Sequence, residues 1–260
     1  MKRATAKPMT RILLLQLQLV FLLTVYLQKG VQAFAPPTMG IGSIFFRPAN
    51  LIVETNRGDD TELVESAVFF TDSFWAGKIG GGVKELLPKQ LKSLGNSQIA
   101  EFRKRYGMKT TVRAKAPQDR RAELIVSKNS ISGEIYGCAG IEVSMVRTPN
   151  GQGIQFQAPL MSNLAVGRKV RRKGIAEDLV QAAEDLALKE WGYDECYLYV
   201  EKRNVPALKL YKKLGYKVMW EDDEATTLLP TNRGTVVSAP TVILCMKKRL
   251  GKGLFGNLFG

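Results

Sequence analysis

The chain has 260 residues, of which 45% are hydrophobic and 24% charged, and its formal net charge is +14. This composition is typical of a globular protein, and the length suffices for one well-buried domain after a leader. The chain contains no histidine. That absence excludes Ser-His-Asp and Cys-His hydrolases and most transition-metal sites, so we expect no metal cofactor.

Residues 1–33 have the layout of a secretory signal peptide. A basic start without acidic residues precedes an apolar run over residues 12–27, and small residues flank the expected cleavage site after Ala33. The alternative is an uncleaved membrane anchor, but the run is shorter than the ~20 residues of a typical span and contains two glutamines. We therefore expect membrane contact only through this leader, and only if it stays uncleaved.

The junction Ala33-Phe34-Ala35-Pro36 resembles that of plastid proteins from diatoms and other algae with secondary plastids, in which a transit peptide follows the signal peptide. Residues 34–49 contain Arg47 but no acidic residue, which fits a short transit peptide. The resemblance implies a location in the plastid (chloroplast) stroma. Simple secretion is the alternative.

The three cysteines favour a reducing compartment. Cys138, Cys196 and Cys245 are widely spaced, and each lies in an apolar strand-like run. We predict small buried side chains rather than a disulfide framework or zinc ligands. A plastid stroma fits this pattern better than the outside of a cell.

The positive charge does not by itself indicate a nucleic-acid partner. Five basic residues lie in residues 1–33, which leaves +9 for the rest of the chain. These charges are dispersed, and no basic patch with interleaved aromatic residues occurs, so no nucleic acid is expected as a partner.

Residues 50–250 are predicted to form one domain, followed by a flexible tail over residues 251–260. Hydrophobic periodicity, capping residues and turn residues define its elements. Strands are expected at 50–54, 121–127, 134–143, 160–166, 196–200, 217–220 and 241–246, and helices at 62–74, within 84–106, at 175–191 and at 204–215. Residues 221–240 are predicted to be an irregular loop. This order predicts an α+β fold with a mixed sheet.

A basic turn joins the strand at 160–166 to the helix at 175–191. Arg171, Arg172 and Lys173 precede Gly174, which allows close backbone approach, and Ala176 leaves room beside it. A helix N-terminus presents unpaired N–H groups and the positive end of the helix dipole. The turn is therefore predicted to bind a phosphate, although a solvated basic turn is the alternative.

The last predicted helix carries a second group of candidate residues. Asn204 is suited to cap it, with Pro206 in its first turn. Tyr211 lies seven residues after Asn204, two helical turns on and therefore on the same face. Gly215 is suited to end the helix.

Together these segments resemble the GNAT family of acetyl-CoA-dependent N-acetyltransferases. The motifs that carry the resemblance are Leu164-Ala165-Val166, Arg171-x-x-Gly174-x-Ala176, Asn204-x-x-Ala207, Leu210-Tyr211 and Gly215-Tyr216. They cover about 57 residues closely and, loosely, most of the chain from residue 50. The resemblance implies the GNAT fold, whose mixed, mostly antiparallel central sheet is flanked by helices.

The resemblance also implies roles for these residues, with acetyl-CoA as co-substrate. The backbone of Leu164, Ala165 and Val166 would pair with the pantetheine arm, and one N–H would polarise the thioester carbonyl. Tyr211 would be the general acid that protonates the departing sulfur. The remaining cofactor-binding positions are Arg171 and the amides of Arg172, Lys173, Gly174, Ile175, Ala176 and Glu177 for the pyrophosphate, then Asn204 and Ala207.

No general base is assigned. Some bacterial protein N-terminal acetyltransferases of the family carry a catalytic glutamate five residues before the asparagine, where this chain has Tyr199. Glu201, Glu142, or a water held by Ser162 and Asn163 remain alternatives.

Two aromatic residues, Phe74 and Trp75, lie at a predicted helix end where the family places its acceptor loop. They either line the acceptor site or pack in the core.

The predicted function is plastid N-acetylation by direct attack of an amine on the thioester, which needs neither a metal nor a covalent intermediate. The acceptor is expected to be a protein or peptide amine, either N-terminal or lysine. The reason is that plant plastid relatives look similar around Asn204–Gly215. A small amine such as a polyamine or an amino acid is the first alternative, since the acidic run 221–224 could attract a cation, although a net +9 opposes it. A non-catalytic acyl-CoA-binding module is the second.

Overall fold

The computed structural model describes residues 48, 50–56, 58–107, 121–147 and 155–251. The predicted signal peptide lies outside the described residues, as do the transit-peptide-like segment apart from Pro48 and the tail apart from Gly251. All described residues belong to one compact unit of the chain. Within them, no helix combines the length and apolar character needed to cross a membrane.

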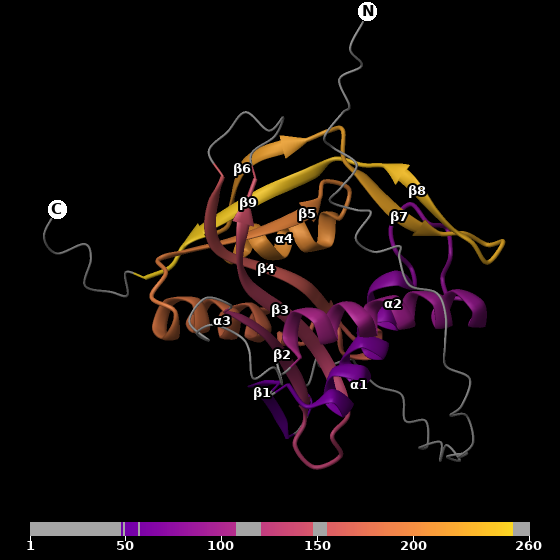
Figure 1. Cartoon of the computed structure of the whole chain (residues 1–260), viewed down its shortest axis with the longest axis horizontal. Helices are drawn as coiled ribbons and strands as arrows, with labels where there is room; N and C mark the ends of the chain where they lie inside the picture. The colour runs from indigo at the N-terminus through magenta and orange to yellow at the C-terminus, as the bar shows by residue number, and fades with distance from the viewer. Residues whose placement is uncertain (1–47, 49, 57, 108–120, 148–154, 252–260) are drawn as a thin grey trace, which may run out of the picture. The chain divides into compact units, whose positions relative to one another are not determined.

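A seven-stranded sheet forms the centre of this unit, in the order β1-β2-β3-β4-β5-β9-β6 (Figure 1). Every neighbouring pair is antiparallel except β4 and β5, which are parallel. The predicted mixed, mostly antiparallel sheet flanked by helices is thus confirmed. The strands are β1 Leu51–Thr55, β2 Ala122–Asn129, β3 Ile135–Val146, β4 Phe156–Val166, β5 Glu195–Glu201, β6 Lys217–Asp222 and β9 Ile243–Arg249.

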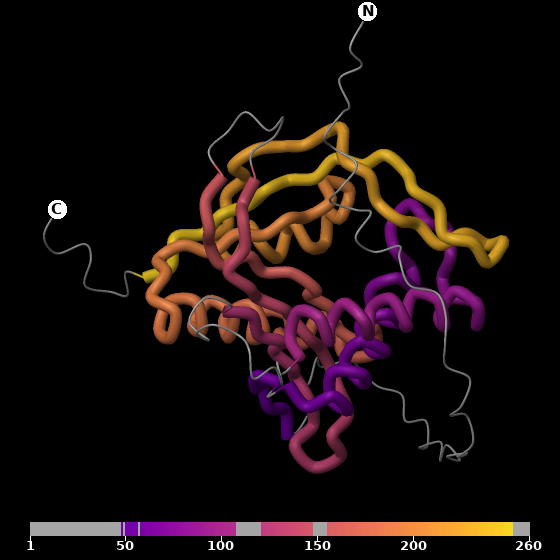
Figure 2. The backbone as a smooth tube through the Cα atoms, viewed as in Figure 1, coloured from indigo at the N-terminus to yellow at the C-terminus, as the bar shows by residue number. Residues whose placement is uncertain are grey.

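The helices begin where the capping residues indicate. Asp59 caps the first helix, since its carboxylate accepts from the Glu62 N–H at 2.9 Å, and Pro88 opens the second. The path of the chain can be followed in Figure 2. The helices are α1 Asp60–Phe70, continued by the π-helical turn η3 Thr71–Trp75, then α2 Pro88–Tyr106, the 3-10 turn η6 Arg168–Val170, α3 Ile175–Asp185 with the π-helical turn η7 Leu186–Glu190, and α4 Val205–Lys213.

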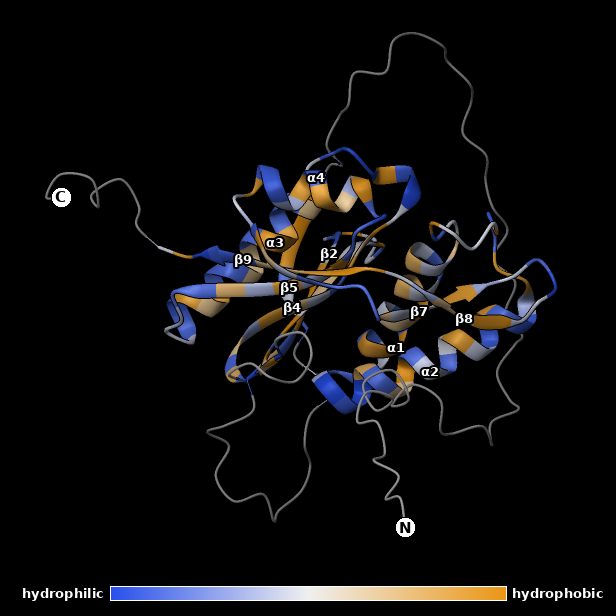
Figure 3. Cartoon of the chain, turned by 90° about the horizontal axis from the view of Figure 1, so that it is seen from above, coloured by the Kyte–Doolittle hydropathy of each residue, from blue (hydrophilic) through white to orange (hydrophobic). Residues whose placement is uncertain are grey.

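Figure 3 shows α3 and α4 on one side of the sheet and α1 and α2 on the other. The two largest of three hydrophobic clusters lie beneath these helices, on opposite faces of the sheet. The alternation of strand side chains divides them: Cys138 packs with α1 and α2, whereas Ala139 packs with α3. Phe102 and Leu179 are fully buried, one in each core. Burial of such a side chain stabilises the fold by about 2 kcal/mol. The three cysteines are buried, as predicted.

The prediction of an irregular loop over residues 221–240 is wrong. Strands β7 Thr226–Pro230 and β8 Val236–Pro240 form a separate antiparallel hairpin. The two prolines argued against strands, but each ends its strand, where a missing N–H costs little. The turn is held from outside the hairpin, because Gln90 Nε2 donates to the carbonyls of Thr231 and Thr235 at 2.9 and 2.8 Å.

Candidate active site

The parallel pairing of β4 with β5 ends early. Only two residue pairs join the strands, Leu160 with Tyr197 and Met161 with Leu198. Strand β4 then continues along β3 with a register shift between Cys138 and Gly140, and Asn163 adopts a left-handed φ of 53°. Backbone groups of residues 162–166 that point away from β3 therefore have no strand partner on that side among the described residues. Such groups are suited to pair with an extended ligand.

The predicted residues Leu164, Ala165 and Val166 lie in this unpaired stretch. Their side chains are occupied: Ala165 is buried with α1 and α2, while Leu164 and Val166 pack against the α3 core. Any contact that they make with a ligand between the strands must therefore come from the backbone.

Helix α3 begins directly after this stretch. Gly174 is its N-cap residue with a φ of 84°, and no side chain caps the helix. The Glu177 and Asp178 N–H groups both donate to the Gly174 carbonyl, at 2.9 and 3.1 Å. The amides of Ile175 and Ala176 have no intrahelical partner, as at any helix start. A Cβ at Gly174 would meet no atom within 4 Å, so glycine is required there for its φ and not for space.

Three charged residues of the turn have different surroundings. Arg171 Nε donates to the Val166 carbonyl at 3.0 Å and its Nη2 to the Ser73 carbonyl at 2.9 Å, so Arg171 ties the turn to β4 and η3. Arg172 is exposed and Lys173 half-buried, and neither has an acidic partner in the part of the chain that the structure describes. These two cations are available to an anion at the helix start.

Other predicted residues of this region face inward or are already paired. Ile175 is 1% exposed, so only its backbone can reach a ligand. The Glu177 carboxylate pairs with Lys213 of α4 at 2.7 Å. Ala176 is half-buried.

Helix α4 starts at the predicted cap. Asn204 Oδ1 accepts from the Ala207 N–H at 3.3 Å, and Ala207 itself packs against the α3 core. The Asn204 Nδ2 donor has no partner among the described residues. A ligand can therefore use this donor without breaking the cap.

Tyr211 is buried on α4, with its ring centroid 5.8 Å from that of Tyr216. Burial raises the pKa of Tyr211, and the nearby Cys196 thiol adds to the effect. The phenol is therefore protonated at neutral pH, as a general acid must be. Among the described residues, nothing hydrogen-bonds to its hydroxyl.

Both carboxylates considered as a base are held by cations. Glu142 receives Arg105 Nε at 3.2 Å and Arg105 Nη2 at 2.9 Å. Glu201 receives Lys78 at 3.1 Å and Arg203 at 2.7 Å. Burial raises the pKa of Glu201, but Lys78, Arg203 and Thr227 outweigh it and hold that pKa below its usual value. A carboxylate whose pKa is lowered is a poorer proton acceptor, which argues against Glu201 as the base.

The water site proposed at Ser162 and Asn163 is shared with residues that the sequence did not single out. Arg105 Nη2 donates to Ser162 Oγ at 2.7 Å, and Asn163 Nδ2 donates to the Tyr106 hydroxyl at 3.0 Å. A Cβ at Gly140 would overlap that hydroxyl. A glycine inside a strand was the available signal, because it often marks a close approach by another group.

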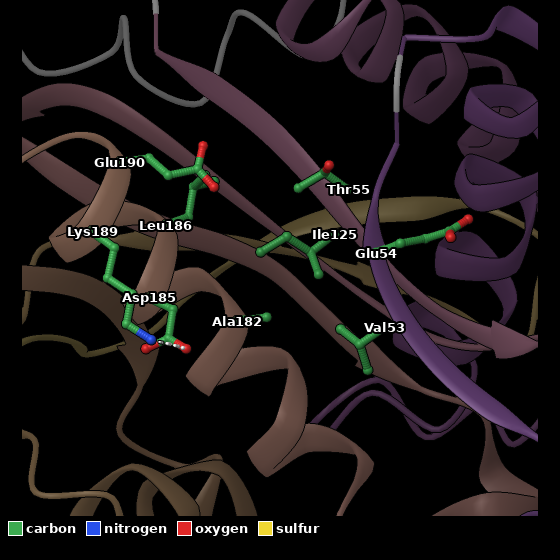
Figure 4. Close-up of a pocket in the computed structure, with 9 residues that line it drawn as sticks. All are labelled: Val53, Glu54, Thr55, Ile125, Ala182, Asp185, Leu186, Lys189 and Glu190. Atoms are coloured by element: carbon green, nitrogen blue, oxygen red, sulfur yellow. Dashed lines mark ion pairs between the residues drawn. The ribbon is translucent and has the colours of Figure 1, made fainter.

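A pocket elsewhere contains none of the predicted site residues (Figure 4). It lies between β1 and the end of α3 remote from Gly174, over Val53 and Ala182, with the Asp185–Lys189 ion pair of 3.1 Å at its rim. The unpaired stretch of β4, the start of α3 and the start of α4 remain the group of features that fits the sequence motifs.

Comparison with known proteins is consistent with this choice. Residues 91–216 match the acetyltransferase (GNAT) family. This GNAT region contains β4, α3, β5 and α4, and thus every residue predicted to be catalytic or to bind the cofactor. The matched region is just under half of the chain and is similar to a family of acetyltransferases. Among the described residues, no group of three or more His, Cys, Asp or Glu side chains could hold a metal ion.

The curated relatives match only part of this chain. A stretch of 66 residues is 42% identical to GCN5-related N-acetyltransferase 4, chloroplastic, of Arabidopsis thaliana, over 25% of this chain and 22% of that protein. GCN5-related N-acetyltransferase 7, chloroplastic, of the same plant is 32% identical over 69 residues, 26% of this chain and 25% of that protein. An N-alpha-acetyltransferase of Saccharolobus solfataricus is 40% identical over 55 residues, 21% of this chain and 33% of that protein. The chain thus spans a third or less of the length of these relatives.

Solved structures show a distant likeness. A GNAT-family acetyltransferase from Streptococcus pneumoniae has a TM-score of 0.48 and 14% identity, with 77% of this chain and 99% of that one covered. A GCN5-related N-acetyltransferase from Kribbella flavida has a TM-score of 0.48 and 20% identity, over 77% of this chain and 98% of that one.

Proposed function

We propose that this chain is a plastid acetyl-CoA-dependent N-acetyltransferase that acts on primary amines of proteins, with residues 50–250 as its catalytic domain. The observation that carries the proposal is the position of three features within one family match. These are the unpaired stretch of β4, the uncapped start of α3 at Gly174 and the buried phenol of Tyr211.

Acetyl-CoA binding is assigned mainly to backbone groups. The amides of Ile175 and Ala176, with Arg172 and Lys173 beside them, are suited to the pyrophosphate. The backbone groups of residues 164–166 that point away from β3 are suited to the amides of the pantetheine arm, apart from the Val166 carbonyl, which accepts from Arg171. Asn204 Nδ2 is suited to a further acceptor on the cofactor. Glu177 contributes less in this scheme, because its N–H already donates to Gly174.

The reaction transfers the acetyl group in one step. The amine nitrogen attacks the thioester carbonyl carbon, the C–S bond breaks, and the thiolate takes the proton of the Tyr211 hydroxyl. The acetylated nitrogen then releases its extra proton to solvent, and the tyrosinate regains a proton from solvent. A backbone N–H of the β4 stretch stabilises the charge that develops on the carbonyl oxygen. Since Glu142 and Glu201 are both held by cations, the acceptor is expected to react after losing its proton to solvent.

Two observations support a protein acceptor over a polyamine. One relative is named an N-alpha-acetyltransferase. In addition, two of the carboxylates that could attract a polycation are already paired, since Glu221 pairs with Lys202 at 2.7 Å and Glu201 pairs with two cations. The plastid location is supported by the chloroplastic names of the plant relatives and by the Ala33-Phe34-Ala35-Pro36 junction.

The test is acetyl-CoA turnover by the purified protein. The acceptors are peptides with free N-termini and internal lysines, together with spermidine and free amino acids, and mass spectrometry identifies the products. Acetylated peptides are expected, and the modified nitrogen separates α-amine from ε-amine chemistry. Acetylation of small amines alone would show that the substrate is a metabolite and not a protein. Acetyl-CoA binding without turnover would favour a non-catalytic module.

A further inference from the structure

The ammonium group of Lys78 is enclosed by side chains from three separate segments. Its Nζ lies 5.0 Å from the ring centroid of Phe74 and 4.5 Å from that of Trp75. The same nitrogen lies 3.1 Å from Glu201 Oε1 and donates to Thr227 Oγ1 at 2.8 Å. We call Phe74, Trp75, Glu201 and Thr227 the ammonium cage.

The ammonium cage has the chemistry that recognises an alkylammonium ion. Aromatic faces attract a cation, and the attraction strengthens when water is excluded. The carboxylate and the hydroxyl accept the charged hydrogen bonds. The side chains of Lys78 and Glu201 are only 10% and 16% exposed. Burial lowers the pKa of Lys78, and Glu201 counteracts this only in part.

The carboxylate of the cage does not depend on Lys78 for its position. Arg203 Nε donates to Glu201 Oε2 at 2.7 Å, and Thr241 Oγ1 donates to the same oxygen at 3.3 Å. Thr227 donates to Oε1 at 2.8 Å. If Lys78 leaves, Glu201 therefore keeps three hydrogen bonds and stays oriented toward the vacated position.

The residues of the ammonium cage lie on helical or strand elements, whereas Lys78 lies in a connecting segment. Phe74 and Trp75 lie on η3, Glu201 ends β5 and Thr227 lies on β7. Lys78 instead lies in the segment between η3 and α2, where Gly77 and Gly80 have φ values of 72° and 90°. Glycine adopts such angles without strain. The long, flexible stem of Lys78 can move its ammonium group out of the cage by rotation about its own bonds, while the walls remain in place.

The ammonium cage also lies near the proposed reaction centre. Glu201 is three residues beyond Leu198, the last residue of β5 that pairs with β4. Three strand residues span about 10 Å, so the cage is at the open end of the split between the two strands. The proposed acceptor amine must reach the thioester from this region.

We propose that the ammonium cage is a binding subsite for a primary alkylammonium group of the acceptor, such as a lysine side chain, and that Lys78 is its internal competitor. The subsite rests on the proposed function in that its ligand is taken to be the acceptor. When a competitor occupies the cage for most of the time, the apparent affinity for an added ligand is the intrinsic affinity multiplied by the fraction of time that the cage is free. If that fraction is about one tenth, removing the competitor strengthens binding about tenfold.

The experiment measures binding of n-butylammonium by calorimetry to the wild type and to the Lys78→Met variant, which keeps the apolar stem and loses the charge. Binding at least about tenfold tighter is expected in Lys78→Met. Lys78→Arg, which keeps a cation, is expected to bind as weakly as the wild type. Adding Glu201→Gln to Lys78→Met is expected to abolish the gain.

Controls separate the subsite from general effects. Lys189→Met removes an exposed lysine, 67% exposed in its pair with Asp185, and should not change binding. Thermal melting verifies that each variant is folded, and Lys78→Ala replaces Lys78→Met if the latter is not. Equal binding by the wild type and the folded Lys78 variant would overturn the proposal.

Turnover with a lysine-containing peptide, measured in parallel, distinguishes the two proposals. The expected result is a lower KM in Lys78→Met together with tighter n-butylammonium binding. Peptide turnover without any gain in binding removes the subsite and leaves the proposed function. A gain in binding without turnover by any variant removes the proposed function and, with it, the assignment of the acceptor as the ligand.

Discussion

The two sides of the split between β4 and β5 are built in different ways. On the side of α3, the candidate groups are backbone amides and carbonyls within one continuous stretch, residues 162–177. On the side of β7, the ammonium cage consists of side chains, and Lys78 bonds to a residue 149 positions away. The first side depends on local backbone conformation and the second on tertiary packing, so substitutions should affect them differently.

The largest loss of activity is expected from Tyr211→Phe. This variant tests whether the Tyr211 hydroxyl on α4 takes part in catalysis. Loss of a general acid typically lowers kcat by about 100-fold or more. The hydroxyl has no protein partner among the described residues, so stability should change little. Steady-state kinetics and calorimetry with acetyl-CoA check this. Unchanged kcat would exclude Tyr211 as the acid, and loss of acetyl-CoA binding would give it a binding role instead.

Gly174→Ala tests how much the backbone conformation at the start of α3 contributes to acetyl-CoA binding. Alanine at a positive φ costs about 1–2 kcal/mol of unfolding free energy. Acetyl-CoA affinity should also fall about tenfold, equivalent to about 1.4 kcal/mol of lost anion binding. Gly192→Ala is the matched control, because Gly192 has a φ of 74° and open space around its Cβ position. Equal acetyl-CoA affinity in the two variants would contradict a special role for Gly174.

Tyr106→Phe tests the contact that holds the irregular stretch of β4. Losing the bond from Asn163 should lower kcat about fivefold, equivalent to about 1 kcal/mol. Tyr136→Phe is the control, since the Tyr136 hydroxyl accepts from Asn129 at 3.2 Å in another part of the sheet. Chemical denaturation measures stability in both variants. If both lower kcat by the same factor, the effect is one of stability and not of the β4 geometry.

The smallest expected effect is a change in the pH dependence of stability when Glu201 of the ammonium cage is replaced. Because the pKa of Glu201 is lowered in the folded state, its ionisation stabilises the fold above the unfolded pKa, and this contribution is lost as pH falls through the folded pKa. Glu201→Gln should therefore be less stable than the wild type at neutral pH, with the gap narrowing in acid. Urea denaturation at pH 7 and near pH 3 measures the gap. A gap of the same size at both pH values would show that the charge of Glu201 is not its source.

Sequence motifs predicted the local elements well for a physical reason. Asp59, Asn204 and Gly174 act through hydrogen bonds or backbone angles within a few residues, so their neighbours in sequence are also their neighbours in space. Alternating and helical hydrophobic patterns similarly predicted the strands of the central sheet and the helices. The same locality explains why the GNAT motifs could be recognised from short segments.

The sequence was least informative where distant segments meet. The hairpin β7–β8 was missed because Gln90 of α2, far away in the chain, holds its turn. The commitment of Glu142 to Arg105 and of Glu201 to Lys78 and Arg203 could not be foreseen either. The pairings with Arg105 and Lys78 depend on packing between segments that are distant in sequence, whereas Arg203 lies only two residues from Glu201.

The two hydrogen bonds of Arg171 connect the proposed acetyl-CoA site to the ammonium cage, and this connection bears on the order in which the substrates bind. Arg171 holds both the end of β4 and Ser73, and Ser73 directly precedes the two aromatic residues of the ammonium cage. A ligand that fixes the turn at Arg171 should therefore also restrain η3 and the aromatic wall that it carries. We expect an ordered sequence in which acetyl-CoA enters first and the acceptor follows, with the acceptor binding weakly to the free enzyme.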